Sequence, residues 1–170
     1  QQVFNDGVDW IEIRYAEVIM NMAEAANEIG HTTEALDVLK QIRKRAGIDA
    51  GTNDMYGLKA GMSKDEMREA IMAERFIEFS MEQKRFWDLR RLRWLNRLDG
   101  KKRHALASIP INPADLTAGF TYEIREADIE QAMSMPDNYY FFPIPRSEIR
   151  NNPKLKQNKG WDNGDFDPLL

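Results

Sequence analysis

Apolar residues recur at helical spacing in two runs near the start of the chain, the first followed by Gly30 and the second by Gly47. Spacings of three and four residues place such positions on one face of a helix. Glycine commonly follows the last helical residue, and Thr32 is of a type that caps a helix start. The pattern therefore predicts a helical hairpin over residues 13–47. The apolar positions of its two stripes are Tyr15, Val18, Ile19, Met22, Ala26, Ile29, Ala35, Leu36, Leu39, Ile42 and Ala46.

This hairpin resembles a tetratricopeptide unit. Met22-Ala23 stands where that repeat has Leu-Gly, and Ala35 holds the small position of its second helix. Ile19 and Ala26 replace the Trp and Tyr of the repeat. Such a unit buries its faces only against stacked neighbours, normally about three repeats in all, and we find one here.

A longer helical segment is predicted over residues 63–98. It follows a stretch, residues 48–62, that contains glycines and shows no periodicity, which indicates a loop. Ser63 and Glu66 form the pattern S-x-x-E of a capping box. We expect a helix that begins at Lys64, bends near residues 80–84 and fades by residues 99–100.

The rest of the chain is predicted to be largely irregular. Residues 101–120 mix prolines and a glycine with polar residues, and residues 122–133 fit either a short strand or a short helix. Prolines exclude a long helix and a central strand over residues 136–161, so we expect an extended, proline-rich strip there. These prolines are Pro143, Pro145 and Pro153.

The composition fits a globular chain without a cofactor motif. The 170 residues are 42% hydrophobic and 31% charged, and the net charge of −4 gives nucleic acid no overall attraction. There is no cysteine, and His31 and His104 lie far apart, so no disulfide, metal site or cofactor is expected. No apolar run approaches the roughly 20 residues of a membrane span. We predict a mainly α fold with extensive irregular loops.

Two carboxylates, Glu74 and Glu78, lie one helical turn apart on an otherwise apolar face. Such a pair could act as general acid and base in glycoside hydrolysis. The alternative, which we favour, is a buried ion network, because an unpaired buried carboxylate is strongly unfavourable. The arginines available to such a network include Arg14, Arg43, Arg85, Arg90 and Arg91.

A basic stretch between Lys84 and Arg103 carries nine lysines and arginines, with Trp87 and Trp94 among them. Aromatic rings between arginines can bind single-stranded nucleic acid. Here the arginines lie at mixed helical phases and the rest of the chain is acidic, so we expect no nucleic-acid partner.

Two tyrosines are weak candidates for flat platforms that bind sugar rings. Tyr56 lies in a predicted loop beside Asn53, Asp54 and Gly57, and Tyr122 is the second candidate. Most other aromatic residues are expected in the core.

Three blocks of sequence together resemble the SusD/RagB family. Residues 74–78 read Glu-Arg-x-x-Glu, and residues 85–91 read Arg-Phe-Trp-Asp-Leu-Arg-Arg. Residues 142–161 contain Phe-Pro-Ile-Pro, then Glu-Ile, Asn-Pro, Gln-Asn and Gly-Trp, while residues 14–17 are similar to the family's tetratricopeptide-like helix. The family often has glycine where Gln83 stands, so we expect a less sharp helix break here.

The resemblance implies a surface-exposed lipoprotein of the outer membrane that binds a nutrient for a SusC-like TonB-dependent transporter. The nutrient would be an oligosaccharide or a peptide, and no catalysis is implied. Residues 1–170 would form a single unit, the C-terminal region of a larger SusD-like protein whose ligand contacts come largely from upstream loops. The membrane would be reached only through a lipid anchor absent from this chain.

The resemblance also suggests a structural ion network beneath the proline-rich strip, in which Glu74 and Glu78 pair with arginines of residues 85–91. Its expected members are Glu74, Glu78, Arg85, Asp88, Arg90 and Arg91. Two other functions stay open on the residues alone. One is a helical-repeat scaffold that binds a partner protein, and the other is a glycoside hydrolase that uses Glu74 and Glu78.

Overall fold

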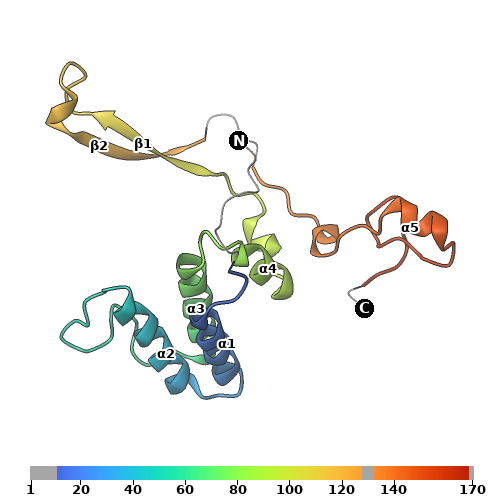
Figure 1. Ribbon diagram of the computed structural model, residues 1–170, viewed down its shortest axis with the longest axis horizontal. Coiled ribbons are helices and arrows are strands. Elements are labelled where there is room, and N and C mark those ends of the chain that lie inside the picture. The colour runs from blue at the N-terminus through green and yellow to red at the C-terminus, as the bar shows by residue number, and fades with distance from the viewer. Residues whose placement is uncertain (1–10, 128–131, 169–170) are drawn as a thin grey trace. The chain divides into compact units, whose positions relative to one another are not determined.

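The computed structural model describes residues 11–127 and 132–168, and it confirms a mainly α fold (Figure 1). By the density of backbone contacts, the chain divides into two compact units, Gln1–Arg85 and Phe86–Leu170. The single unit expected over residues 1–170 stays a prediction. Within the described residues, no helix combines the length and the apolar character needed to cross a bilayer.

The first unit is built from a helical hairpin and a third helix. Helix α1 (Tyr15–Glu28) pairs with α2 (Thr32–Arg45), and α3 (Lys64–Glu78) contacts both of them (Figure 1). The hairpin predicted over residues 13–47 is confirmed. The side chains that fill this core include Ile19, Met20, Ala23, Leu39, Ile42, Met67, Ile71 and Phe79.

Only some of the apolar residues that were predicted to form the buried face of the first helix are in fact buried. Ile19 and Ala26 are buried, whereas Tyr15, Val18 and Met22 are exposed, as is Ile29. The reason is that α1 packs against two helices, so its buried face turns toward the small residues Ala16 and Ala23 and the flanking Met20 and Asn27. Small residues at such positions allow helix axes to approach closely.

Both helices of the hairpin end in a Schellman motif. After α1, the amide of His31 donates to the Ala26 carbonyl and the amide of Gly30 donates to Asn27. Gly30 and Gly47 have φ values of 92° and 79°, in the left-handed region where glycine avoids a clash of Cβ. The glycines predicted to end the helices are therefore confirmed. The predicted cap Thr32 is wrong, since it is the first residue of α2 and His31 is the N-cap.

The predicted start and break of the second helical segment are confirmed. The Glu66 amide donates to Ser63 Oγ at 3.2 Å, and the Ser63 amide donates to Glu66 Oε2 at 2.9 Å, which is a capping box. Helix α3 then ends at Glu78 and α4 (Lys84–Arg91) begins after a turn. A short 3₁₀ helix, η1 (Leu95–Leu98), follows.

Gln83 gives the helix break its geometry, with φ at 59°. A left-handed backbone at this residue turns the chain between α3 and α4, and it is the conformation for which glycine has the lowest cost. Gln83 therefore adopts the backbone that glycine would adopt, and the expectation that glutamine makes the break less sharp stays a prediction.

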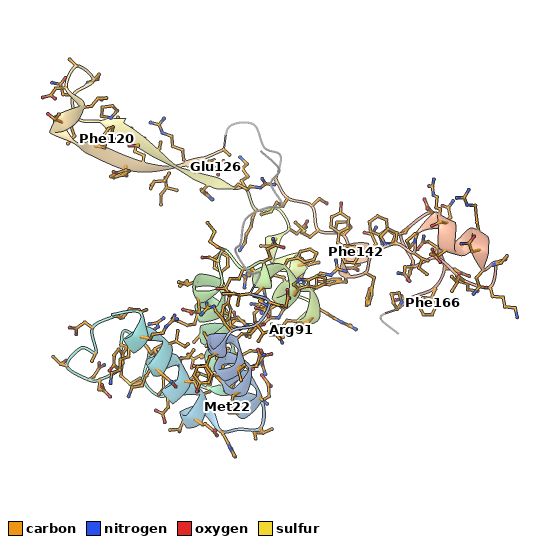
Figure 2. All side chains as sticks on the ribbon, in the orientation of Figure 1. Met22, Arg91, Phe120, Glu126, Phe142 and Phe166 are labelled. Atoms are coloured by element: carbon orange, nitrogen blue, oxygen red, sulfur yellow. The ribbon has the colours of Figure 1, made fainter. Side chains whose placement is uncertain are left out.

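The second unit contains a β-hairpin that the sequence did not predict. Strands β1 (His104–Pro110) and β2 (Phe120–Glu126) pair antiparallel, and Figure 2 labels Phe120 and Glu126, the first and last residues of β2. In the register of the pair, Leu106 lies opposite Ile124. The turn between them includes η2 (Leu116–Ala118). Within residues 101–120, residues 104–110 are thus strand where irregular structure was predicted, and residues 122–126 are strand. The remainder of the 122–133 segment includes residues 128–131, which lie outside the described residues.

The strip over residues 136–161 is extended between two short helices, η3 (Asp137–Tyr140) and α5 (Arg146–Asn151). Pro136 and Pro145 are the residues that precede these helices, where a fixed φ suits a helix start. Beyond α5, bridges join Asn158 to Phe166 and Lys159 to Gly164. The proline-rich strip is therefore a set of tight turns that fold back on one another.

Candidate functional site

Glu74 belongs to an ion pair that ties α3 to α2. Its side chain is 6% exposed, and its Oε2 accepts a hydrogen bond of 2.8 Å from Nε of Arg43. Nη1 of Arg43 also donates to the carbonyl of Tyr56, at 3.0 Å. One arginine from the last turn of α2 thus joins the α3 carboxylate to the loop of residues 48–62.

Glu78 lies between two arginines, one at the start of α1 and one in the last turn of α2. Its Oε1 accepts from Nη1 of Arg14 at 2.6 Å, and its Oε2 accepts from Nη2 of Arg45 at 2.6 Å. Arg14 also donates from Nε and Nη2 to the carboxylate of Glu82, and its guanidinium covers the Phe79 ring at 4.9 Å. These contacts raise the pKa of Arg14 above its usual value, with the Glu82 hydrogen bond as the largest cause, and lower the pKa of Glu82.

The partners of the two carboxylates differ from those that the family resemblance suggested. The observed partners are Arg14, Arg43 and Arg45, which precede α3 in the sequence. The expected partners were arginines of residues 85–91, which follow it. Of the other expected members, Arg85 covers the Phe76 ring at 4.8 Å, and Asp88 accepts from Arg91. Arg14 and Arg43 were among the arginines recognised as available, while Arg45 was missed.

These contacts argue against glycoside hydrolysis at Glu74 and Glu78. A general acid needs a raised pKa and access to the substrate oxygen. Here both side chains are largely covered, and the oxygens of each carboxylate are engaged by arginine side chains, so a substrate oxygen has little access to them. The pair therefore has the contacts of a structural brace between helices.

In the second unit, Gln157 holds the two ends of the proline-rich strip together. Its side chain is buried and makes a reciprocal pair with the backbone of Ile144: its Nε2 donates to the carbonyl at 2.9 Å, and its Oε1 accepts from the amide at 2.8 Å. Because prolines on either side of Ile144 have no amide, this residue supplies the one N–H of the Pro-Ile-Pro segment. Glutamine satisfies both backbone groups at once.

Trp161, the last residue of the family signature, adds further hydrogen bonds to this structure. We call the hydrogen-bonded structure that joins residues 138–144 to residues 157–161 the lock. The indole Nε1 of Trp161 donates to the carbonyls of Asn138 and Phe141, at 3.0 and 3.1 Å. Its ring also stacks on Tyr139, with 6.1 Å between centroids. The Phe-Pro-Ile-Pro, Gln-Asn and Gly-Trp blocks are therefore partners in one hydrogen-bonded structure.

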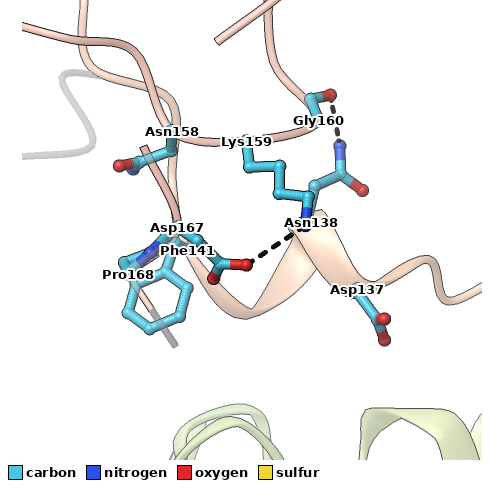
Figure 3. A pocket seen from close by; sticks show the side chains of 8 residues that line it. All are labelled: Asp137, Asn138, Phe141, Asn158, Lys159, Gly160, Asp167 and Pro168. Atoms are coloured by element: carbon cyan, nitrogen blue, oxygen red, sulfur yellow. Dashed lines mark hydrogen bonds and ion pairs between the residues drawn. The ribbon is translucent and has the colours of Figure 1, made fainter. Parts of the chain in front are cut away.

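A hollow of about 310 Å³ lies within this lock, with Asn138, Asn158 and Lys159 among its lining residues (Figure 3). The Asn138 side chain reaches across it to the Gly160 carbonyl at 3.0 Å, and Lys159 pairs with Asp167 at 3.2 Å. Asn158 likewise donates to the Phe142 carbonyl. The side-chain amides of Asn138 and Asn158 and the amine of Lys159 are thus occupied by contacts within the strip. We therefore assign this hollow to the scaffold and not to a ligand site.

A second cavity of about 310 Å³, the aromatic cavity, has almost entirely apolar walls. A sugar presents hydroxyl groups that need hydrogen-bond partners, and these walls offer few besides Arg90. The cavity therefore fits an apolar group better than a sugar ring. Its lining residues are Phe86, Leu89, Arg90, Leu95, Leu98, Met135, Tyr139, Phe141, Phe142 and Trp161.

The two predicted platform tyrosines have opposite environments. Tyr56 is 9% exposed and has φ at 51°, so it anchors its loop and the prediction of an exposed platform is wrong. Polar neighbours in the sequence had suggested exposure, but the left-handed backbone turns this ring inward. Tyr122 is 63% exposed on β2, opposite Ser108. Its ring face is accessible, and its role as a ligand contact stays a prediction.

The chain matches the family model described as the SusD family over residues 2–161, and it belongs to that family. It is similar to two SusD-like proteins of Formosa agariphila. It is 38% identical to P2 over 93 residues, which cover 54% of this chain and 18% of P2. It is 26% identical to P25 over 166 residues, which cover 95% of this chain and 26% of P25.

Among solved structures, the chain resembles a SusD-like protein from Bacteroides fragilis, with a TM-score of 0.69 and 30% identity. The similarity covers 89% of this chain and 26% of that one. The chain thus spans about a quarter or less of the length of these relatives.

Proposed function

We propose that this chain is part of a non-enzymatic nutrient-binding protein that serves a SusC-like TonB-dependent transporter of the outer membrane. The observation that carries the proposal is the family match over residues 2–161. The nutrient is an oligosaccharide, and a peptide is the alternative ligand. Attachment to the membrane as a surface lipoprotein would use a lipid anchor on a cysteine outside residues 1–170.

The described residues support a binding role over a catalytic one. Glu74 and Glu78, the carboxylate pair with hydrolase-like spacing, are neutralised by arginine. Open aromatic faces are available on Tyr122 and on Trp87, which is 55% exposed. An aromatic face gives a sugar ring apolar contact at low conformational cost.

The test is calorimetric titration of the complete protein with neutral oligosaccharides, uronate oligosaccharides and short peptides. We expect saturable binding of one class without release of shortened products, and co-purification with the co-expressed transporter. Tyr122→Ala should weaken oligosaccharide binding, while Tyr15→Ala, which removes a similarly exposed ring on α1, should not. Shortened products would identify a hydrolase, and the absence of both nutrient binding and co-purification would reject the proposal.

A protein-interaction scaffold is the second candidate, favoured by the exposed apolar side of α1. Tyr15, Val18 and Met22 project from that side at helical spacing and are exposed. A tetratricopeptide-like hairpin normally covers such a side with a neighbouring helix. If Val18→Glu abolishes co-purification with a protein partner and leaves nutrient binding intact, this second function is supported.

A further inference from the structure

The C-terminal end of α4 carries a hollow of about 410 Å³ with an unusual concentration of positive charge. We call it the arginine hollow, because three guanidinium groups line it together with the indole of Trp87 and the ring of Tyr140. One wall is shared with the aromatic cavity through Arg90 and Phe141. Its lining residues are Trp87, Arg90, Arg91, Arg93, Tyr140 and Phe141.

The guanidinium of Arg90 packs on aromatic rings and donates a hydrogen bond to one backbone carbonyl. Its guanidinium carbon lies 4.1 Å above the centre of the Phe142 ring, and Nη2 donates to the Tyr140 carbonyl at 2.6 Å. No carboxylate pairs with it among residues 11–127 and 132–168, and burial lowers its pKa. A guanidinium carries five N–H donors in a planar fork, so this side chain retains donors for an anion.

Arg91 is oriented by a buried carboxylate. Its Nε and Nη2 donate to Oδ1 of Asp88 at 3.0 and 2.9 Å. Asp88 is itself buried on α4, so it fixes the direction of this guanidinium. The three guanidinium groups that line the arginine hollow make it a place that attracts an anion.

Arg93 occupies a backbone position that favours glycine. After α4, the Trp94 amide donates to the Leu89 carbonyl and the Arg93 amide donates to Arg90, which is a Schellman motif. The residue at the corresponding place is Gly30 after α1 and Gly47 after α2. Arg93 has φ at 56°, where a Cβ is unfavourable.

The exposed side chain of Arg93 makes no ion pair or hydrogen bond within the described part of the chain that would offset this strain. Backbone strain that no contact in the fold compensates is characteristic of functional positions. The side chain of Arg93 instead adds a third guanidinium to the arginine hollow.

We infer that the arginine hollow binds an anionic group carried on a sugar ring, either a uronate carboxylate or a sulfate ester. Planar guanidinium forks match the oxygen pairs of both groups. The exposed ring of Trp87 offers an apolar face to the sugar that carries the charge. This inference rests on the proposed nutrient-binding function and narrows its ligand to acidic glycans.

The test is calorimetric titration of the complete protein with trigalacturonate, a sulfated carrageenan oligosaccharide, neutral maltotriose and sodium sulfate alone. We expect the two anionic oligosaccharides to bind at least about tenfold more tightly than maltotriose, with an affinity that falls as salt rises. The preferred one of the two identifies the charged group.

The variant Arg93→Gly distinguishes a loss of ligand binding from a loss of stability, because the two quantities should change in opposite directions. It should weaken binding of the anionic oligosaccharide about tenfold and at the same time raise the thermal midpoint, because glycine relieves the left-handed backbone. Lys154→Ala removes an exposed positive charge elsewhere in the second unit and should change neither quantity. Arg93→Lys should restore part of the affinity through charge without the planar fork.

Several results would overturn the inference. Equal affinity for maltotriose and the anionic oligosaccharides, unchanged in Arg93→Gly, would reject it and leave the nutrient-binding function standing. Sulfate that binds as tightly as the sulfated oligosaccharide would reject the role of the sugar ring. If sulfate binds at the hollow and no glycan binds, the acidic-glycan ligand is rejected, and the nutrient-binding function fails as well if no short peptide binds.

Discussion

A Cβ atom on Gly160 would lie 2.7 Å from the Cβ of Asn138, on the side chain that donates to the Gly160 carbonyl at 3.0 Å. The two residues face each other across the lock formed by the proline-rich strip. Gly160 also has φ at 84°. The glycine of the closing Gly-Trp pair is therefore required for space as well as for backbone conformation.

Gly160→Ala should destabilise the second unit by about 2–4 kcal/mol, since it adds a steric clash to a left-handed alanine. The matched control is Gly100→Ala, at a φ of 72° with no neighbouring atom within 4 Å of the added Cβ. It should cost only about 1–2 kcal/mol. Urea unfolding of both variants measures the difference, and equal losses would show that Asn138 moves aside freely.

Gln83→Gly should stabilise the protein by about 0.5–1 kcal/mol, because the relief of a left-handed glutamine exceeds the added entropy of the unfolded glycine. Gln41→Gly serves as the control, since Gln41 lies in the interior of α2. That change should destabilise by about 1 kcal/mol. Thermal midpoints that fall in both variants would contradict the role assigned to Gln83.

Glu74→Gln should destabilise the first unit by about 2 kcal/mol, because it leaves the charge of Arg43 without a carboxylate in a poorly solvated place. The Arg43 side chain is 22% exposed. Glu82→Gln is the comparison: Arg14 keeps Glu78, and the more exposed pair should contribute about 1 kcal/mol or less. Chemical denaturation that ranks the two variants in the opposite order would refute this assignment.

The stability of the first unit should fall in acid through Glu28. Hydrogen bonds from Arg68, the largest cause, and from Lys64 lower the pKa of Glu28 from 4.5 to about 2. A carboxyl whose folded-state pKa is depressed stabilises the fold above its unfolded pKa, and this contribution is lost as pH falls through the folded value. The loss should therefore extend from about pH 4.5 down to about pH 2.

Unfolding measured across that range should show a shallower acid limb for Glu28→Gln than for the parent protein. Glu148→Gln, which removes a carboxylate from α5, serves as the charge-matched control and should follow the parent curve. Identical slopes for the parent and Glu28→Gln would mean that the Arg68 contact does not persist in solution.

The helices were predictable because their signals are local. The Ser63–Glu66 capping box, Gly30 and Gly47 are set by a few neighbouring residues, and the structure confirms each of them. The hairpin of β1 and β2 was missed because its apolar residues do not alternate with polar ones in β1, and both strands are largely exposed. In β2, by contrast, Phe120, Tyr122 and Ile124 alternate with polar residues, so a period of two that could have identified this strand was present in the sequence.

The arginine partners of Glu74 and Glu78 could not be predicted from the local sequence, because they stand far away along the chain. Arg43 stands 31 residues from Glu74, and Arg14 stands 64 residues from Glu78. Helical phase shows that the carboxylates share a face but cannot show which helices cover it. Likewise, Tyr56 was assigned to the surface from its polar neighbours, whereas its burial follows from a left-handed turn that no local motif announced.

The lock of the proline-rich strip has a kinetic consequence. Its hydrogen bonds join residues close in the chain: Gln157 to Ile144 across 13 residues and Trp161 to Phe141 across 20. Closing so short a loop loses little chain entropy, and low contact order favours rapid folding. The helical brace at Glu78 must instead bring together residues 64 apart. In pulsed hydrogen exchange, the amide of Ile144 should therefore gain protection early, which would make the family signature an early folding nucleus.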